Sequence, residues 1–249
     1  SDPQAIVLRA DLKWIAGELG AARNLDVFLS RLVKPGADRK PHKPGVAVLS
    51  RALRQRREDA FARARAEVEG PRFRRLVLDI AAWIEVGDWT RNPDNPACMF
   101  RKGTIAATAA KQLRRRRKAI LKRGKDLDAM DPQRRHKLRI RVKKLRYAAE
   151  FLVSAFPRKK SMRRQVCFVA SLEKLQDALG DLNDIAVHEK LLKQLVDSEY
   201  GDGKRHGGRA KKGLVAGRLL GREEARFNPA FRKAKSAYAA FTKAKPFWK

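Results

Sequence analysis

Four residues between positions 136 and 146 have the types and the spacing needed to bind a row of anions. They are His136, Arg139, Lys143 and Arg146, at intervals of three, four and three residues. This spacing places all four on one flank of an α-helix, as a stripe about 15 Å long at 1.5 Å per residue. A line of cations suits a line of anions such as successive phosphates, because charge-assisted hydrogen bonds are short and strong. The structural alternative is that these side chains lay their stems over the core and keep their heads in water. We call these four residues the basic stripe.

A second group of cations precedes the basic stripe. Residues 114–118 form an unbroken run of five cations, so some of them must face solvent however the chain packs. We expect about half of the group to join the basic stripe in one binding groove. The candidates in this segment are Lys111, Arg114, Arg115, Lys118 and Lys122.

The charge of the whole chain also indicates a polyanionic partner. The 249 residues include 59 Lys and Arg against 27 Asp and Glu, a net charge of +32. Residues 101–164 alone hold 24 cations against four carboxylates. Such a density destabilises a compact fold by self-repulsion unless a polyanion neutralises it, and solubility requires far fewer charges. Nucleic acid, an anionic membrane and a phosphate polymer are the candidate partners at this point.

Several classes of protein are excluded by what the sequence lacks. No run approaches the ~20 apolar residues of a membrane span, so we expect no membrane partner. The two cysteines, Cys98 and Cys167, cannot form a disulfide framework, which favours a reducing cytoplasm. The four histidines contain no i, i+4 ligand pair, and no nucleophile stands with an evident base. We therefore expect no metal, no cofactor and no enzymatic activity.

The apolar residues recur every three or four positions almost throughout, which predicts an all-α protein. The first stripe is Leu8, Leu12, Ile15 and Leu19, on one helix face. The pair Asp131–Pro132 predicts a helix start, with an N-cap followed by proline at the first helical position. Further helices are expected at about 46–69, 71–86, 104–127, 132–156, 161–198, 209–226 and 229–244. Connectors rich in Pro, Gly or Asn are expected at 34–45, 88–98 and 201–208.

The chain contains an internal repeat. Residues 12–32 align without a gap with residues 172–192, and residues 71–83 match 229–241 in the same order. The identical pairs include Leu12 and Leu172, Leu19 and Leu179, and Gly20 and Gly180. Two matches at nearly one offset predict a duplicated helical unit, with a first repeat at about 1–100 and a second at about 101–249. Two antiparallel bundles are the natural packing. A basic helix precedes the aligned stretch only in the second repeat, so we expect the first repeat to lack its opening helix.

Several segments resemble those of a known family. Residues 136–151, HKLRIRVKKLRYAAEF, resemble the signature helix of the CHAD family, the conserved histidine α-helical domain. Residues 19–27, LGAARNLDV, and 175–184, LQDALGDLND, resemble its two repeat motifs, and KPFW at 245–248 resembles its usual ending.

The resemblance covers essentially the whole chain. It implies one domain of two pseudo-symmetric four-helix bundles around a basic groove that binds inorganic polyphosphate. It also implies the basic stripe as the site, with cations of the preceding helix alongside. The family's first helix, which carries a second basic stripe, has no match in this chain.

Two functions remain as alternatives. The first is non-catalytic binding of inorganic polyphosphate in the cytoplasm, at polyphosphate granules and beside proteins that metabolise the polymer. The second is binding of nucleic acid through the phosphate backbone of a duplex. Residues 101–146 contain no Phe, Trp or Tyr, so this segment has no platform on which single-stranded bases could stack.

Three other groups of polar residues receive structural interpretations. We expect Arg23 to pair with Asp26 one turn away, and Asn183 and Asp184 to serve the crossing of the bundles. Residues 201–208 mix glycine with cations, as anion nests do, but lack the spacing of a phosphate loop. A flexible loop between helices is the favoured interpretation of that segment.

Overall fold

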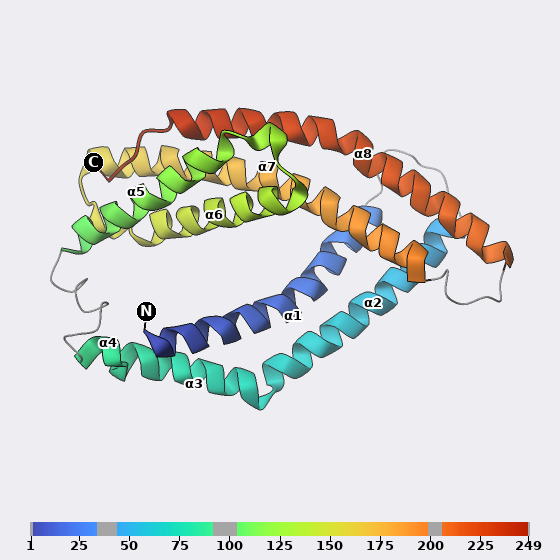
Figure 1. Cartoon of the computed structure of the whole chain (residues 1–249), viewed down its shortest axis with the longest axis horizontal. Helices are drawn as coiled ribbons and strands as arrows, with labels where there is room; N and C mark the ends of the chain where they lie inside the picture. The colour runs from blue at the N-terminus through green and yellow to red at the C-terminus, as the bar shows by residue number, and fades with distance from the viewer. Residues whose placement is uncertain (1, 34–43, 92–103, 199–205, 249) are drawn as a thin grey trace. The chain divides into compact units, whose positions relative to one another are not determined.

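The computed structural model describes residues 2–33, 44–91, 104–198 and 206–248 (Figure 1). Within these ranges every regular element is a helix, which confirms the all-α prediction. None of these helices is long and apolar enough to cross a membrane. The chain forms two compact units, residues 1–102 with 199–216 and residues 103–198 with 217–249. The assignment of one domain built from two duplicated bundles stays a prediction.

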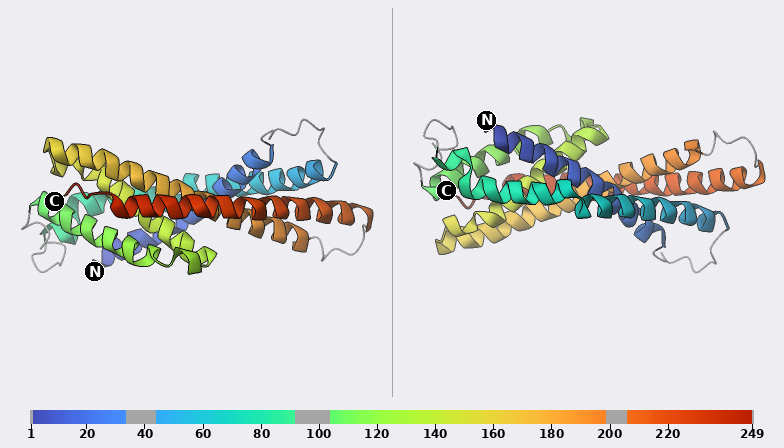
Figure 2. Two further views of the ribbon diagram at one scale, coloured as in Figure 1. Left: turned by 90° about the horizontal axis from the view of Figure 1, so that it is seen from above. Right: turned by 90° about the horizontal axis from the view of Figure 1, so that it is seen from below.

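The first unit contains four complete helices in its described residues. They are α1 (Pro3–Val33), α2 (Pro44–Glu69), α3 (Pro71–Val86) and the single turn α4 (Asp88–Arg91). Proline at the first position of α3, directly after Gly70, separates α2 from α3. Both of these helices pack against α1 (Figures 1 and 2). Leu8, Ile15 and Leu76 form the buried core between α1 and α3.

Two expectations for the first unit are corrected. Leu8 and Ile15 are buried, but Leu12 and Leu19 are each 48% exposed, so only half of the expected stripe faces the core. Residues 88–91 form α4 where a loop was expected. This turn forms because the Trp89 indole donates to the Trp83 carbonyl, and the Thr90 hydroxyl donates to the Gly87 carbonyl. The remainder of that predicted loop, and residues 34–43, lie outside the described residues.

The second unit contains four long helices with short 3₁₀ turns between them. The long helices are α5 (Ile105–Gly124), α6 (Pro132–Phe151), α7 (Lys159–Ser198) and α8 (His206–Lys243). The 3₁₀ turns are η2 (Leu127–Ala129) and η3 (Val153–Ala155). The part of α8 up to residue 216 belongs to the first unit. Thr104 caps α5 by accepting from the Ala107 amide. Asp131 caps α6 by accepting from the Arg134 amide at 2.7 Å, which confirms the predicted start. In Figures 1 and 2, α5 and α6 run antiparallel, with α7 and α8 alongside.

Two helices end earlier than the apolar pattern predicts. The helix expected to reach residue 127 ends at Gly124, because Leu127 turns into the core through η2 and is only 3% exposed. The helix expected to reach residue 156 ends at Phe151, and Phe156 then packs edge-on against Phe247. In both places a side chain beyond the helix packs against the core, which requires a tighter turn than an α-helix provides.

The two helices expected at 209–226 and 229–244 form one helix, α8, with Pro229 inside it. A proline removes a backbone hydrogen bond and normally ends a helix. Here Phe227 and Phe231 stack across the proline at 5.6 Å, and Glu223 binds Arg226 one turn before it. These contacts offset the missing backbone hydrogen bond at Pro229. The glycine-rich loop predicted at 201–208 is also corrected in part, because α8 begins at His206, while residues 201–205 lie outside the described residues.

An aromatic cluster closes the core of the second unit. The Phe168 ring of α7 contacts Phe241 of α8 and the C-terminal residues Phe247 and Trp248, with ring centroids 5.0 to 6.0 Å apart. All four side chains are at most 5% exposed. The buried residues of α6 recur at intervals of four, three and four, namely Leu138, Val142, Leu145 and Ala149. Their burial sets the rotation of α6 and thereby the direction of the basic stripe.

Candidate anion-binding site

The basic stripe lies along the flank of α6 that faces α7. Beside it on α7 stand Gln176, Gly180 and Asn183, spaced by four and three residues and therefore on one helix face. The Nδ1 atom of His136 lies 2.5 Å from Oδ1 of Asn183. The Nε atom of Arg146 donates to Oε1 of Gln176 at 3.1 Å. Two of the four stripe residues are thus oriented by neutral amide side chains of α7.

Arg139 occupies the middle of the stripe and has the most unusual environment. Its side chain is half-buried, and a Cβ atom at Gly180 would lie 3.6 Å from its Nε atom. A Cβ atom there would make an ordinary van der Waals contact with the guanidinium, so Arg139 lies alongside the backbone of α7 at Gly180. The buried Nε atom has no hydrogen-bond partner among the described residues. A buried donor without a partner costs free energy, and an anion at this position would satisfy it.

An exposed aromatic ring adjoins the stripe. Tyr147 is 48% exposed, with the Arg146 guanidinium 4.7 Å and the Lys143 ammonium 5.5 Å from its ring centre. Arg146 also donates to Glu150 at 3.0 Å, and its side chain is only 18% exposed. Arg146 is therefore the most constrained cation of the stripe, while Lys143 is exposed and, among the described residues, contacts the Tyr147 ring without a hydrogen bond or ion pair.

The cations of α5 separate into two groups. The five candidates from the sequence, Lys111, Arg114, Arg115, Lys118 and Lys122, are all exposed, and no hydrogen bond joins them to the basic stripe among the described residues. Arg117, from the same run, points inward and donates to the carbonyls of Thr242 and Ala244 at the end of α8. Desolvation by burial lowers the pKa of Arg117. Arg117 therefore stabilises the fold, and the joint groove of α5 and α6 stays a prediction.

The repeated motif meets different surroundings in the two units. Leu172 and Leu179 of α7 are at most 1% exposed, whereas their counterparts Leu12 and Leu19 are half exposed. A Cβ atom at Gly20 would have no neighbour within 4 Å, unlike one at Gly180. In the second unit α6 packs over this face of α7. No described helix of the first unit covers the matching face of α1.

The sequence alone did not predict that residues of α7 bind the basic stripe. Gln176 carried no functional prediction, and Asn183 carried a structural one, yet both hold stripe residues. Their spacing with Gly180 was the available signal, but only the packing of α6 against α7 shows what this face contacts. The predicted pair of Arg23 with Asp26 is replaced by a pair between Arg57 of α2 and Asp26, at 2.7 Å. Asp26 therefore forms its ion pair with a residue of the neighbouring helix and not with one of its own helix.

The described residues contain no group of three or more His, Cys, Asp or Glu side chains placed to hold a metal ion. What the site offers is hydrogen-bond donors and positive charge. Its donors are an imidazole, two guanidinium groups and an ammonium, which are the groups that bind phosphate oxygens in proteins.

Comparison with known proteins identifies the family and the fold of the chain. A search of curated proteins finds no match. The crystal structure of the CHAD domain from the plant Ricinus communis superposes with a TM-score of 0.70 at 25% identity, over 96% of this chain and 73% of that one. The model of the CHAD domain family matches residues 1–193. This match covers most of the chain, from α1 through nearly all of α7, and the chain therefore belongs to the CHAD domain family.

Proposed function

We propose that this protein binds inorganic polyphosphate without catalysis, through the basic stripe of α6 in a groove lined by Lys, Arg and His. The observation that carries the proposal is Arg139, half-buried along Gly180 with a donor that no described residue satisfies. On either side of it along α6, His136 and Arg146 are held by amides of α7. A row of cations positioned before the ligand arrives loses less side-chain entropy on binding.

A linear phosphate polymer fits this row better than other polyanions. It carries negative charge on every unit and has no bulky groups between phosphates, so consecutive phosphates can follow a straight helix flank. The cations of α5 would contribute through long-range attraction, because they are exposed and near in sequence to the stripe. Proteins that metabolise polyphosphate remain the proposed partners, with the cytoplasm and polyphosphate granules as the proposed location.

Nucleic acid remains the second candidate because of Tyr147 and Phe151. These rings are 48% and 83% exposed, and they begin directly after the segment that lacks aromatic residues. Together with Arg146 above the tyrosine ring, they could stack on bases. This observation favours single strands, whereas the sequence alone favoured a duplex.

A competition experiment tests the proposal. The protein is saturated with fluorescently labelled duplex DNA, or with a labelled single strand, at one fixed salt concentration. Long-chain polyphosphate is then added, and unlabelled DNA serves as the control at equal phosphate concentration. We expect polyphosphate to displace both probes at a lower phosphate concentration than DNA does. If DNA displaces its own label more effectively, the protein is a nucleic-acid binder and the proposal is wrong.

A further inference from the structure

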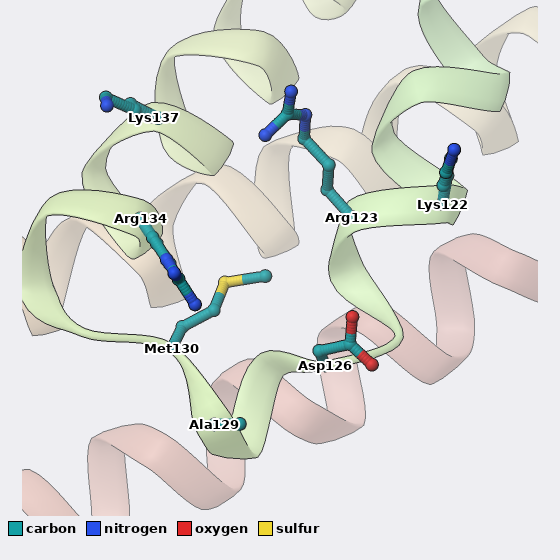
Figure 3. Close-up of a pocket in the computed structure, with 7 residues that line it drawn as sticks. All are labelled: Lys122, Arg123, Asp126, Ala129, Met130, Arg134 and Lys137. Atoms are coloured by element: carbon teal, nitrogen blue, oxygen red, sulfur yellow. The ribbon is translucent and has the colours of Figure 1, made fainter.

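A hollow of about 530 Å³ opens in the second unit beside the turn that joins α5 to α6 (Figure 3). This volume is within the range of about 300–1,000 Å³ typical of small-molecule sites. The ionic residues of its lining are Lys122, Arg123, Asp126, Arg134 and Lys137. Four cations against one carboxylate leave three net positive charges around a space of limited size. Met130 forms an apolar part of the lining.

The hollow and the basic stripe occupy different flanks of α6. Lys137 and Arg139 are two residues apart, which corresponds to about 200° around the helix axis. Arg139 lies against Gly180 of α7, whereas Lys137 shares the hollow with residues of α5. Lys122, which the sequence assigned to the groove of the basic stripe, also lines this separate hollow. A ligand in the hollow would therefore not contact the stripe.

Two arginines from different helices line the hollow. In Figure 3, Arg123 of α5 and Arg134 of α6 stand on opposite sides of the space, with Arg134 directed toward Met130 and Arg123 directed away from the turn, while the ends of Lys122 and Lys137 point outward. Among the described residues, Arg123 has no hydrogen bond or ion pair. Arg134 has an exposed ion pair with Asp131 at 3.4 Å, and such surface pairs contribute little. Both guanidinium groups are therefore available to an anion, and flexible lysine stems can turn toward it.

The turn between α5 and α6, which forms one wall of the hollow, is held by contacts with α6 and α8. Arg135 donates to the Met130 carbonyl at 2.5 Å and lies 5.2 Å from the Phe227 ring. The Tyr238 hydroxyl donates to the Leu121 carbonyl at 2.8 Å near the end of α5. The hollow is thus a fixed feature of the α5–α6 connection, and binding would not have to create it.

We infer that this hollow is a second anion site, which binds the terminal phosphate of a linear oligophosphate. A terminal phosphate carries up to two negative charges near neutral pH, with its second pKa near 6, whereas an internal phosphate carries one. Two arginine forks on opposing walls suit such a compact, multiply charged group. A stripe on an open flank suits a chain that passes along it. The inference stands apart from the proposed function, because it involves other residues and another flank of α6.

Calorimetric titration with tripolyphosphate tests the site. The double variant Arg123→Ala and Arg134→Ala should bind tripolyphosphate at least tenfold more weakly than the wild type, about 1.4 kcal/mol. The control is Arg218→Ala with Arg232→Ala, which removes two exposed arginines of α8 and should change the affinity less than threefold. Far-UV circular dichroism confirms that both variants remain helical. Unchanged affinity in the pocket variant, or an equal loss in the control, would overturn the inference.

Two further titrations distinguish the possible ligands. Cyclic trimetaphosphate has no terminal phosphate and should bind the wild type at least tenfold more weakly than tripolyphosphate; equal binding would contradict terminal recognition. Long-chain polyphosphate is titrated at equal concentration of chain ends. If the Arg123→Ala, Arg134→Ala variant loses affinity for both tripolyphosphate and the long chain, the end of a long chain is a ligand. If it loses affinity for tripolyphosphate alone, the ligand is the free short chain. Substituting the basic stripe should leave tripolyphosphate binding intact, so failure of the proposed function would leave this site standing.

Discussion

Replacing Arg139, Lys143 and Arg146 together by alanine should weaken binding of long-chain polyphosphate at least a hundredfold. Each charge-assisted contact to phosphate contributes about 1.5–3 kcal/mol. Arg139 is half-buried with an unsatisfied donor, so its replacement should remove the full free energy of one such contact. Arg146 already shares its charge with Glu150, and Lys143 is exposed and screened by salt, so both belong at the lower end.

Even if all three contacts are counted at the lower end, they sum to about 4.5 kcal/mol, or about three decades of affinity. A long chain can shift onto neighbouring cations, which recovers part of this loss, so two decades, about 2.7 kcal/mol, is the expected minimum. The helix should persist, because alanine is the best helix former and the three residues lie outside the buried stripe of α6. Titration calorimetry at several salt concentrations measures both the affinity and its salt dependence.

The matched control removes the same side-chain types from the same unit. Arg218, Arg232 and Lys243 lie on α8, are exposed and have no ion pair with the described residues. Their replacement by alanine changes the net charge as much as the stripe variant does. We expect a loss of less than tenfold, from long-range attraction alone. If both triple variants lose affinity equally, only net charge matters and the basic stripe is not a site.

Two predictions concern stability. Gly124→Ala should lower the free energy of unfolding in urea by about 1–3 kcal/mol despite the better helix propensity of alanine, because its methyl group would overlap the Tyr238 ring; an unchanged midpoint would show that this contact is loose. Burial alone raises the pKa of the Glu223 carboxyl, but hydrogen bonding and attraction from His188, and then from Arg226, lower it below the usual value of 4.5. Its ionised form therefore stabilises the fold above that value, and this contribution disappears as the pH falls below 4.5 through the folded-state pKa. The difference in unfolding free energy between the wild type and Glu223→Gln should accordingly shrink from pH 6 to pH 3, and a difference independent of pH would contradict this linkage.

Local patterns in the sequence determined most of what concerns single helices. The three- and four-residue spacing of apolar groups predicts the all-α class, and Asp131–Pro132 predicts the start of α6 to the residue. The same periodicity places the basic stripe on one flank, because side-chain direction along a helix follows from the 3.6-residue turn alone. The signature segment at 136–151 also led to the family that the comparisons show.

Contacts between elements distant in the chain decided the rest. Leu12 and Leu19 have the same local pattern as Leu172 and Leu179, yet only the latter are buried, because burial depends on whether another helix packs over the face. The helix around Pro229 continues because side-chain packing on both sides of the proline offsets the missing hydrogen bond. Local propensity is a weak free-energy term that such packing readily overrides.

The binding sites depend on tertiary structure for the same reason. Sequence spacing shows that four cations share a flank, but not that Gln176 and Asn183 orient two of them or that a third, Arg139, lies beside Gly180. The hollow between Arg123 and Arg134 had no sequence signal, because its two walls come from different helices. A helical period specifies which direction a side chain takes from its own axis. Only the packing of helices against one another specifies what lies in that direction.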